Sequence, residues 1–292
     1  MEISIFYFSG TGNTWWVSKK LKSIFNQKGH HAEIYSIEKN KTNLENDFLK
    51  IVDKSDLVGI GYPVYGSSVP KIMKDWVNEY LCNYTKSNQK KKSAFVFDTM
   101  ALFSGDTPLK MRKLLEKCNF KVKQAINIRM LSNLPQMPRI MTWEVDKQQE
   151  VFEKAEAKCN KLVNKILEEK KWVMRRDPFS RLLGWIQRVG LRLEGKKIKE
   201  WYEIDEERCT LCKKCVNYCP VDNLSIEGNN GDVQVVFGDD CIYCMRCFNF
   251  CPENAIIIME RTRDTDRYRR FRGQIPDFKL SKIRKTKEQN NK

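Results

Sequence analysis

One cysteine pattern occurs twice near the end of this chain and constrains its fold more than any other feature of the sequence. The first copy runs from Cys209 to Pro220 and the second from Cys241 to Pro252, so the pattern repeats after 32 residues. Both copies read Cys-x2-Cys-x2-Cys-x3-Cys-Pro, and together they hold eight of the 11 cysteines. Eight thiols at fixed spacing in so short a segment predict a domain that is built around the group they bind.

The spacing of this repeat indicates iron–sulfur ligation. The apolar start of the chain has no cationic segment before it, unlike a secretory signal, so we expect a cytoplasmic protein whose clustered thiols bind metal and do not form disulfides. Three thiolates on a tight loop reach three irons of one cube, and the fourth, after a short helical turn, points at the other cube. We therefore expect two [4Fe-4S] clusters with crossed ligands. Cluster 1 is assigned Cys209, Cys212, Cys215 and Cys251, and cluster 2 is assigned Cys241, Cys244, Cys247 and Cys219.

A pair of zinc sites is the alternative interpretation, because paired Cys-x2-Cys motifs also bind zinc. Zinc would leave cysteines over in each quartet and does not require the Cys-Pro ending, so the clusters are favoured. Residues 224–237, between the two copies, predict a hairpin with a glycine-rich turn. Residues 201–260 resemble bacterial two-cluster ferredoxins at all eight ligand positions, which implies a small α+β domain with low-potential clusters.

The N-terminal domain is predicted at residues 1–171, and its first 130 residues alternate short apolar runs with helical stretches. This is the pattern of a parallel sheet covered by helices on both faces, and it predicts a doubly wound α/β domain with five strands in a flavodoxin-like order. The strands are predicted at residues 2–8, 31–37, 57–61, 93–98 and 122–129. The helices are predicted at residues 13–27, 43–54, 70–79, 107–117 and 143–171.

A loop of glycines and hydroxyl side chains follows the first predicted strand. It consists of Ser9, Gly10, Thr11, Gly12, Asn13 and Thr14. Backbone N–H groups at such a strand-to-helix turn bind phosphate, and glycine lets the chain approach it closely. The loop lacks the lysine of a Walker loop, so a phosphomonoester fits better than a nucleoside triphosphate. An ordinary helix start is the alternative, because the same residue types are common there.

Two further loops leave the carboxyl ends of predicted strands, where ligands bind in such sheets. With them, the N-terminal part resembles a flavodoxin, whose Ser-x-Thr-Gly-Asn-Thr loop holds the phosphate of FMN and whose next two loops flank the isoalloxazine ring. The resemblance implies that the ring is bordered by Pro63, Val64, Tyr65 and Gly66 and by Thr99, Met100, Ala101, Phe103 and Gly105. Tyr65 and Phe103 are candidates for stacking on the ring, and half-buried loop anchors are the alternative for both.

The formal net charge of +16 is unevenly distributed. Residues 201–259 hold ten acidic and four basic side chains, whereas residues 171–200 hold nine basic and three acidic ones. Residues 172–200 predict a linker with a basic amphipathic helix. Its apolar positions are Phe179, Leu182, Leu183, Ile186 and Val189. We expect this helix to bury its apolar stripe between the domains and to turn its arginines toward the acidic ferredoxin domain, and a helix on a membrane surface is the alternative. The tail, residues 261–292, is basic, and we expect its end to be disordered.

The whole chain resembles the bacterial family that fuses a flavodoxin-like domain to a two-cluster ferredoxin. The resemblance implies an electron-transfer protein that passes single electrons through two clusters to or from FMN. We also expect a redox partner protein, which is an oxidoreductase or an acidic electron carrier. The basic flanks would either dock such an acidic carrier or fold over the acidic ferredoxin domain. A flavin-dependent reductase of a quinone or nitro compound is one alternative. A nucleic-acid-binding protein is another, but no recognisable nucleic-acid motif supports it. We expect no integral membrane segment, and no acid–base or nucleophile pair can be assigned as catalytic.

Overall fold

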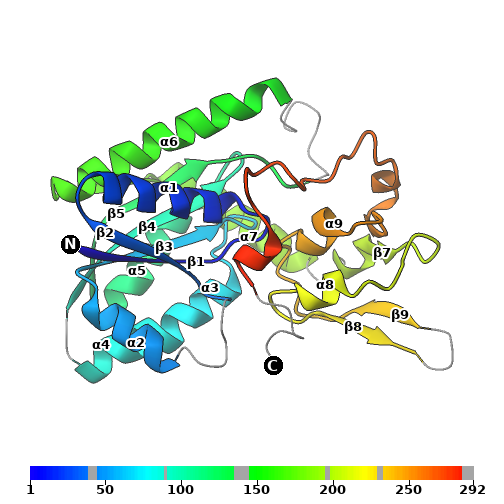
Figure 1. Cartoon of the computed structure of the whole chain (residues 1–292), viewed down its shortest axis with the longest axis horizontal. Coiled ribbons are helices and arrows are strands. Elements are labelled where there is room, and N and C mark those ends of the chain that lie inside the picture. The colour runs from blue at the N-terminus through cyan, green and yellow to red at the C-terminus, as the bar shows by residue number, and fades with distance from the viewer. Residues whose placement is uncertain (39–44, 89–90, 135–144, 195–197, 229–232, 285–292) are drawn as a thin grey trace.

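The N-terminal unit is a parallel sheet between two layers of helices, beside a smaller C-terminal unit (Figure 1). The computed structural model describes residues 1–38, 45–88, 91–134, 145–194, 198–228 and 233–284. The strands of the sheet follow the order β2-β1-β3-β4-β5-β6, and every neighbouring pair is parallel. The order 2-1-3-4-5 is that of a flavodoxin-like doubly wound fold, so the predicted fold class is confirmed. The strands are β1 (Glu2–Tyr7), β2 (His31–Ser36), β3 (Leu57–Pro63), β4 (Lys92–Met100), β5 (Phe120–Arg129) and β6 (Trp172–Val173).

Helices cover both faces of this sheet, which explains why its strands read as nearly continuous apolar runs. One face packs against α1 (Asn13–Gln27) and α6 (Val145–Leu167). The other face packs against α2 (Glu45–Lys54), α3 (Lys71–Trp76) and α5 (Thr107–Lys117). All the loops at the carboxyl ends of the strands therefore meet at one edge of the sheet.

Two details of the sheet domain go beyond the sequence prediction. A sixth strand of two residues, β6, pairs with β5 and begins where we placed the linker. The helix predicted at 70–79 is longer, because α3 continues as a π-helix, η1 (Val77–Cys82), and then as α4 (Asn83–Asn88). The first two residues of the helix predicted at 43–54 lie outside the described residues.

The three cysteines outside the repeat are buried in the sheet domain. Cys82, at the end of η1, and Cys118, after α5, form a disulfide across 36 residues of sequence. Cys159 is free and lies on α6, where burial raises the pKa of its thiol to about 12. None of the three is close to the repeat in the sequence. All three are part of the packed core of the N-terminal unit.

The described residues of the C-terminal unit form two small antiparallel sheets and two short α-helices. The strand β7 (Tyr202–Ile204) pairs with β10 (Ile256–Ile258), and β8 (Leu224–Glu227) pairs with β9 (Gln234–Phe237) as the predicted hairpin. The helices α8 (Lys214–Asn217) and α9 (Arg246–Phe250) each follow one cysteine loop. Left-handed backbone recurs at equivalent positions of the two copies, namely Leu211 and Tyr243, Lys213 and Met245. The sequence repeat is therefore also a repeat of backbone conformation.

The tail returns to the sheet domain after the 3-10 helix η3 (Glu260–Arg263). Its buried apolar side chains pack against Tyr7 and Trp15, and they are Phe271, Ile275, Leu280 and Ile283. The prediction had missed this packing, because four apolar residues at irregular spacing have no helical or strand periodicity. The predicted disorder of the end of the tail concerns residues 285–292, which lie outside the described residues.

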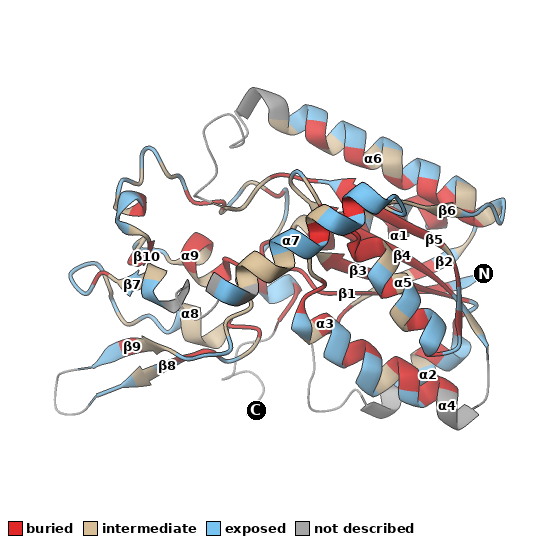
Figure 2. Cartoon of the chain, turned by 180° about the vertical axis from the view of Figure 1, so that it is seen from behind, coloured by how far each residue is buried: buried red, intermediate tan, exposed pale blue. Residues whose placement is uncertain are grey.

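The linker helix α7 (Pro178–Glu194) differs from its prediction. Figure 2 shows it lying across the outside of the molecule, over the junction of the two units. Its predicted apolar stripe is not buried between the domains, because Phe179, Leu182 and Ile186 are exposed. Arg188 donates to Asp106 of the sheet domain at 2.6 Å and does not face the ferredoxin domain. The packed face of α7 is instead the one that contains Ser180 and Gly184.

Candidate cofactor sites

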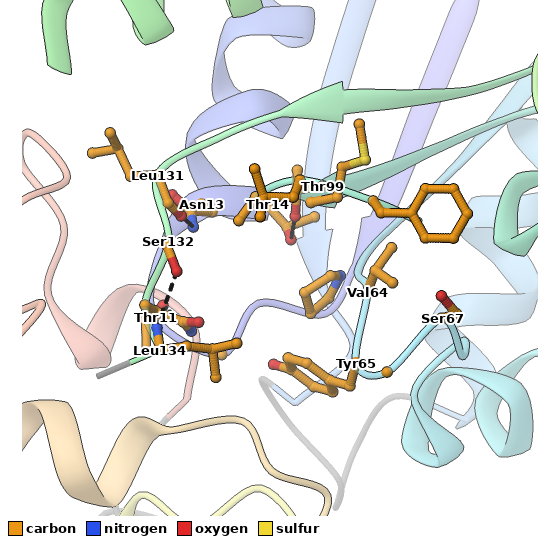
Figure 3. A pocket seen from close by; sticks show the side chains of 18 of the residues that line it. Thr11, Asn13, Thr14, Val64, Tyr65, Ser67, Thr99, Leu131, Ser132 and Leu134 are labelled. Atoms are coloured by element: carbon orange, nitrogen blue, oxygen red, sulfur yellow. Dashed lines mark hydrogen bonds between the residues drawn. The ribbon is translucent and has the colours of Figure 1, made fainter. Parts of the chain in front are cut away.

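A cavity of about 470 Å³ lies at the carboxyl ends of the strands of the sheet domain. Figure 3 shows Thr11, Val64 and Thr99 around it, one from each of the three predicted loops. The predicted residues that line it are Ser9, Gly10, Thr11, Asn13, Thr14, Pro63, Val64, Tyr65, Gly66, Thr99, Met100, Ala101 and Phe103. Gly12 and Gly105 do not line it, and their positive φ of 109° and 57° indicates that they shape the turns of their loops.

Two other segments line the cavity and were missed at the sequence level. The loop after β5 contributes residues 131–134, and α7 contributes Gln187, Gly190 and Leu191. The β5 loop could have been found, because it also leaves the carboxyl end of a parallel strand. No local signal predicts that α7, nearly sixty residues later in the chain, closes the same cavity.

The loop between β1 and α1 is a tight turn that leads directly into a helix start. The hydroxyl of Ser9 accepts hydrogen bonds from the N–H of Gly12 at 3.2 Å and of Trp15 at 3.3 Å, which fixes the turn. Since α1 begins at Asn13, the N–H groups of its first turn have no acceptor within the helix. Such a helix start carries a partial positive charge and favours an anion. The hydroxyl of Thr14, 2.8 Å from that of Thr99, joins this loop to the β4 loop.

Two buried polar atoms beside the cavity have no hydrogen-bond partner among the described residues. They are Oδ1 of Asn13 and the hydroxyl of Tyr65. The side-chain N–H of Asn13 donates to the carbonyl of Leu131 at 2.8 Å, so its Oδ1 remains available as an acceptor. Buried polar atoms in folded proteins normally have partners. A polar ligand in this cavity would supply them, so the residues present fit a flavin mononucleotide.

The two aromatic candidates for ring stacking both line the cavity but have different surroundings. Tyr65 packs edge-on against Phe8 with ring centroids 6.4 Å apart, and burial raises the pKa of its hydroxyl well above 10. Phe103 lies beneath the guanidinium of Arg175, 5.2 Å from its ring centroid. Tyr65 therefore lies between the cavity and the C-terminal unit. Phe103 lies at the other side of the cavity, next to the linker residue Arg175.

The cysteines of the repeat form two groups in the structure. One small cavity is lined by Cys209, Cys212, Cys215 and Cys251, the four thiols that were assigned to cluster 1. Burial, together with the neighbouring Cys251, raises the pKa of Cys215 to about 11. Each group contains one cysteine from the other copy of the repeat, and the sulfur of that cysteine accepts a hydrogen bond from a backbone N–H. The N–H of Ala255 donates to Cys251 Sγ, and that of Asn223 donates to Cys219 Sγ, each at 3.2 Å.

The second group brings Cys219 of the first copy to the three leading thiols of the second copy. The pKa of Cys244 is raised to about 12, mainly by burial and to a smaller extent by the nearby Cys219 and Cys241. The N–H of Tyr243 donates to Cys241 Sγ at 3.4 Å. These thiols would have to be deprotonated to ligate an iron–sulfur cluster, and N–H···S bonds of this kind would tune its potential.

Arg246 joins the second cysteine loop to the phosphate loop, and it was missed at the sequence level. It lies between Cys244 and Cys247, is 1% exposed, and forms a paired salt bridge with Glu38, which follows β2. Its guanidinium also donates to the carbonyls of Ser9 at 2.8 Å and Gly10 at 3.0 Å. A buried guanidinium requires such partners, because its desolvation is costly. The arrangement fixes the second cysteine loop against the turn that would hold the phosphate.

Gly10 shows how closely these two loops approach. A Cβ atom added at Gly10 would lie 2.8 Å from the carbonyl oxygen of Cys244 and would clash with the hydroxyl of Tyr65. Any side chain at this position would separate the loops. The backbone of Cys244 therefore lies against Gly10, which is one of the residues that line the cavity.

Comparisons with known proteins found a family model that matches the C-terminal unit and solved structures that are similar to about half of the chain. Residues 202–252 match the model of a 4Fe-4S dicluster domain. A flavodoxin from the domain Archaea is similar over 56% of this chain and 99% of its own, at 16% identity and a TM-score of 0.39. The flavodoxin of Megasphaera elsdenii is similar over 53% and 98%, at 19% identity and a TM-score of 0.35. A flavo di-iron protein from Thermotoga maritima is similar over 57% and 35%, at 16% identity and a TM-score of 0.39.

No curated protein matches the chain. The fold assignment of the sheet domain therefore rests on its own strand order, and that of the C-terminal unit on the dicluster match. The chain combines a flavodoxin-like domain with an iron–sulfur domain, which makes it a redox protein of the electron-transfer class.

Proposed function

We propose that this chain binds FMN and two [4Fe-4S] clusters and passes single electrons between them. The cavity with its phosphate-binding turn supports the flavin, and the two groups of four cysteines support the clusters. Bound FMN would supply the exchange between two-electron and one-electron chemistry. The protein would hold the three groups in a fixed order, because the second cysteine loop packs on the turn between β1 and α1.

The crossed ligand sets remain part of this proposal. Cys251 lies with the leading thiols of the first copy around one cavity, and Cys219 is an electrostatic neighbour of those of the second copy. In a four-cysteine motif of this type, the fourth thiol belongs to the other cluster. The crossing ties the two copies together, so neither cluster site is complete without both.

The observation that carries the proposal is the contact between the second cysteine loop and the phosphate turn. Arg246 donates to the carbonyls of Ser9 and Gly10, and the backbone of Cys244 lies against Gly10. Cluster 2 would therefore be next to the flavin, and cluster 1, on the far side of it, would meet a redox partner first. The order of the path would be partner, cluster 1, cluster 2 and FMN.

Rapid mixing of the loaded full-length protein with a one-electron reductant tests this order. We expect cluster reduction followed by flavin reduction, at a rate that does not change with protein concentration because both groups lie in one chain. The preparation should first be shown to carry about eight irons per chain, as two cubes require. The full chain is the right material, since the tail packs the two units together and separate domains would lose that packing.

Variants that lack one cluster provide the controls. Cys219→Ser, which removes a cluster 2 ligand, should abolish the flavin phase and leave cluster 1 reducible. Flavin reduction at the wild-type rate in that variant would contradict the proposed path. Steady turnover of a quinone or a nitro compound by the wild-type protein would instead identify the reductase alternative.

A further inference from the structure

The exposed face of α7 is the most apolar surface in the described part of the chain. Of the nine large apolar side chains that are exposed there, five lie on this helix: Phe179, Leu182, Trp185, Ile186 and Leu193. Phe179, Trp185 and Leu193 are 67%, 58% and 76% exposed. Their spacing of three, four and seven residues places them on one side of the helix. An apolar face of this extent marks an interaction surface.

The opposite face of α7 is fixed to the sheet domain, so the helix cannot turn its apolar side inward. Gly184 packs so closely on Gly105 that an added Cβ would lie 3.1 Å from the Cα of Gly105. Arg188 pairs with Asp106 at 2.6 Å and donates to the carbonyl of Ser67 at 2.9 Å. Figure 2 shows the helix across the outer surface of the molecule. The exposed apolar face is therefore part of the folded state.

Basic residues accompany this face. Arg176 and Arg181 are exposed beside it, and residues 171–200 hold nine basic and three acidic side chains. A helix with Trp, Phe and Leu on one side and arginines at its flank has the composition of a helix that lies in the plane of a membrane interface. Two copies of α7 placed face to face would bring like charges together. The positive charge of these arginines instead complements the negative charge of anionic lipid headgroups.

We propose that α7 docks the protein on an anionic lipid bilayer, with Trp185 and its apolar neighbours in the headgroup region. No helix among the described residues is long and apolar enough to cross a bilayer, so the contact would be confined to one surface. Because α7 also lines the cavity through Gln187, Gly190 and Leu191, docking places that cavity directly behind the bound helix. This inference is independent of the proposed electron path.

Cosedimentation of the cofactor-loaded full chain with vesicles tests the proposal. One set of vesicles contains phosphatidylcholine alone, and the other contains phosphatidylcholine and phosphatidylglycerol in equal parts. We expect binding to the anionic vesicles that weakens as salt rises. The double variant Leu182→Glu, Trp185→Glu should reduce the partition coefficient by more than about tenfold, because it removes two exposed apolar side chains that the bilayer would bury. Replacing Arg176 and Arg181 by alanine should reduce it about fivefold per arginine.

Leu49→Glu is the matched control, because Leu49 is also an exposed apolar residue but lies on α2. It should bind vesicles as the wild type does, and unchanged cofactor absorbance shows that each variant is folded. No binding of the wild type, equal binding to neutral vesicles, or full binding of the Leu182→Glu, Trp185→Glu variant would overturn the proposal. A wild-type dimer in light scattering that this variant dissociates would assign the face to a second copy and overturn it as well.

Discussion

Arg246 and Glu38 form a doubly hydrogen-bonded pair at the junction of the two units, with Nη1 to Oε2 and Nη2 to Oε1 both at 2.8 Å. The two residues are 208 positions apart in the sequence, and both side chains are almost completely buried. One comes from the second cysteine loop and the other follows β2. The pair is thus the point at which the iron–sulfur unit is fixed to the sheet domain.

Breaking this pair should destabilise the folded chain. Arg246→Leu leaves Glu38 buried without its main partner, which costs about 3–5 kcal/mol of the free energy of unfolding for a buried pair. Denaturant unfolding followed by circular dichroism measures the loss. The exposed pair of Lys71 and Asp75 on α3 is the control, and Lys71→Met should leave the curve unchanged. A similar loss in both variants would mean that the burial of the Arg246 pair is not the cause.

Removal of Cys251 should damage the cluster of the first copy. Cys251→Ser lies in the second copy but lines the cavity of Cys209, Cys212 and Cys215, so we expect the EPR signal of cluster 1 to change and that of cluster 2 to persist. Cys219→Ser should give the converse result. If Cys251→Ser alters only the cluster held by the second copy, the ligands do not cross.

Asp98 should make the stability of the protein depend on pH. Burial raises the pKa of this carboxyl from 3.8 to about 8, although Thr107 donates to it at 2.6 Å. Between about pH 4 and pH 8 the folded state keeps a proton that the unfolded chain has lost, so stability should fall as pH rises through this window, by at most about 1.4 kcal/mol per pH unit. Asp98→Asn should flatten the fall, which thermal midpoints across this range would show. Asp75→Asn, at an exposed position, should keep the wild-type slope.

Two glycines of α7 provide a matched test of its packing over the cavity. Both substitutions by alanine add about 1 kcal/mol of helix propensity. Gly190→Ala has no atom within 4 Å of the new Cβ, so we expect a higher melting temperature. Gly184→Ala must push α7 away from Gly105, which costs about 1–3 kcal/mol, and should weaken FMN binding in a fluorescence titration. Equal melting temperatures of the two variants without cofactor would show that Gly184 is not closely packed against Gly105.

Local patterns in the sequence were sufficient to predict most helices and strands of both units. The strands of the sheet and the helix at 107–117 follow from apolar periodicity, which depends only on neighbours in the chain. The eight cysteines follow from their spacing, because the geometry of a cube fixes how thiols are placed along a loop. The position of the glycine loop between a strand and a helix could also be predicted, since these elements are adjacent in sequence.

Contacts between distant segments were decided only by the tertiary structure. Arg246 and Glu38 are each unremarkable in sequence, and their pairing depends on the burial of two charges at a junction that no local pattern encodes. The packing of the tail, in which Ile283 lies in the core with Tyr7, is also not encoded by a local pattern. Nor is the orientation of α7, whose apolar stripe faces outward because the small residue Gly184 packs inward against Gly105. Sequence periodicity shows that a helix has an apolar face, but close packing of small residues against another segment decides which face is buried.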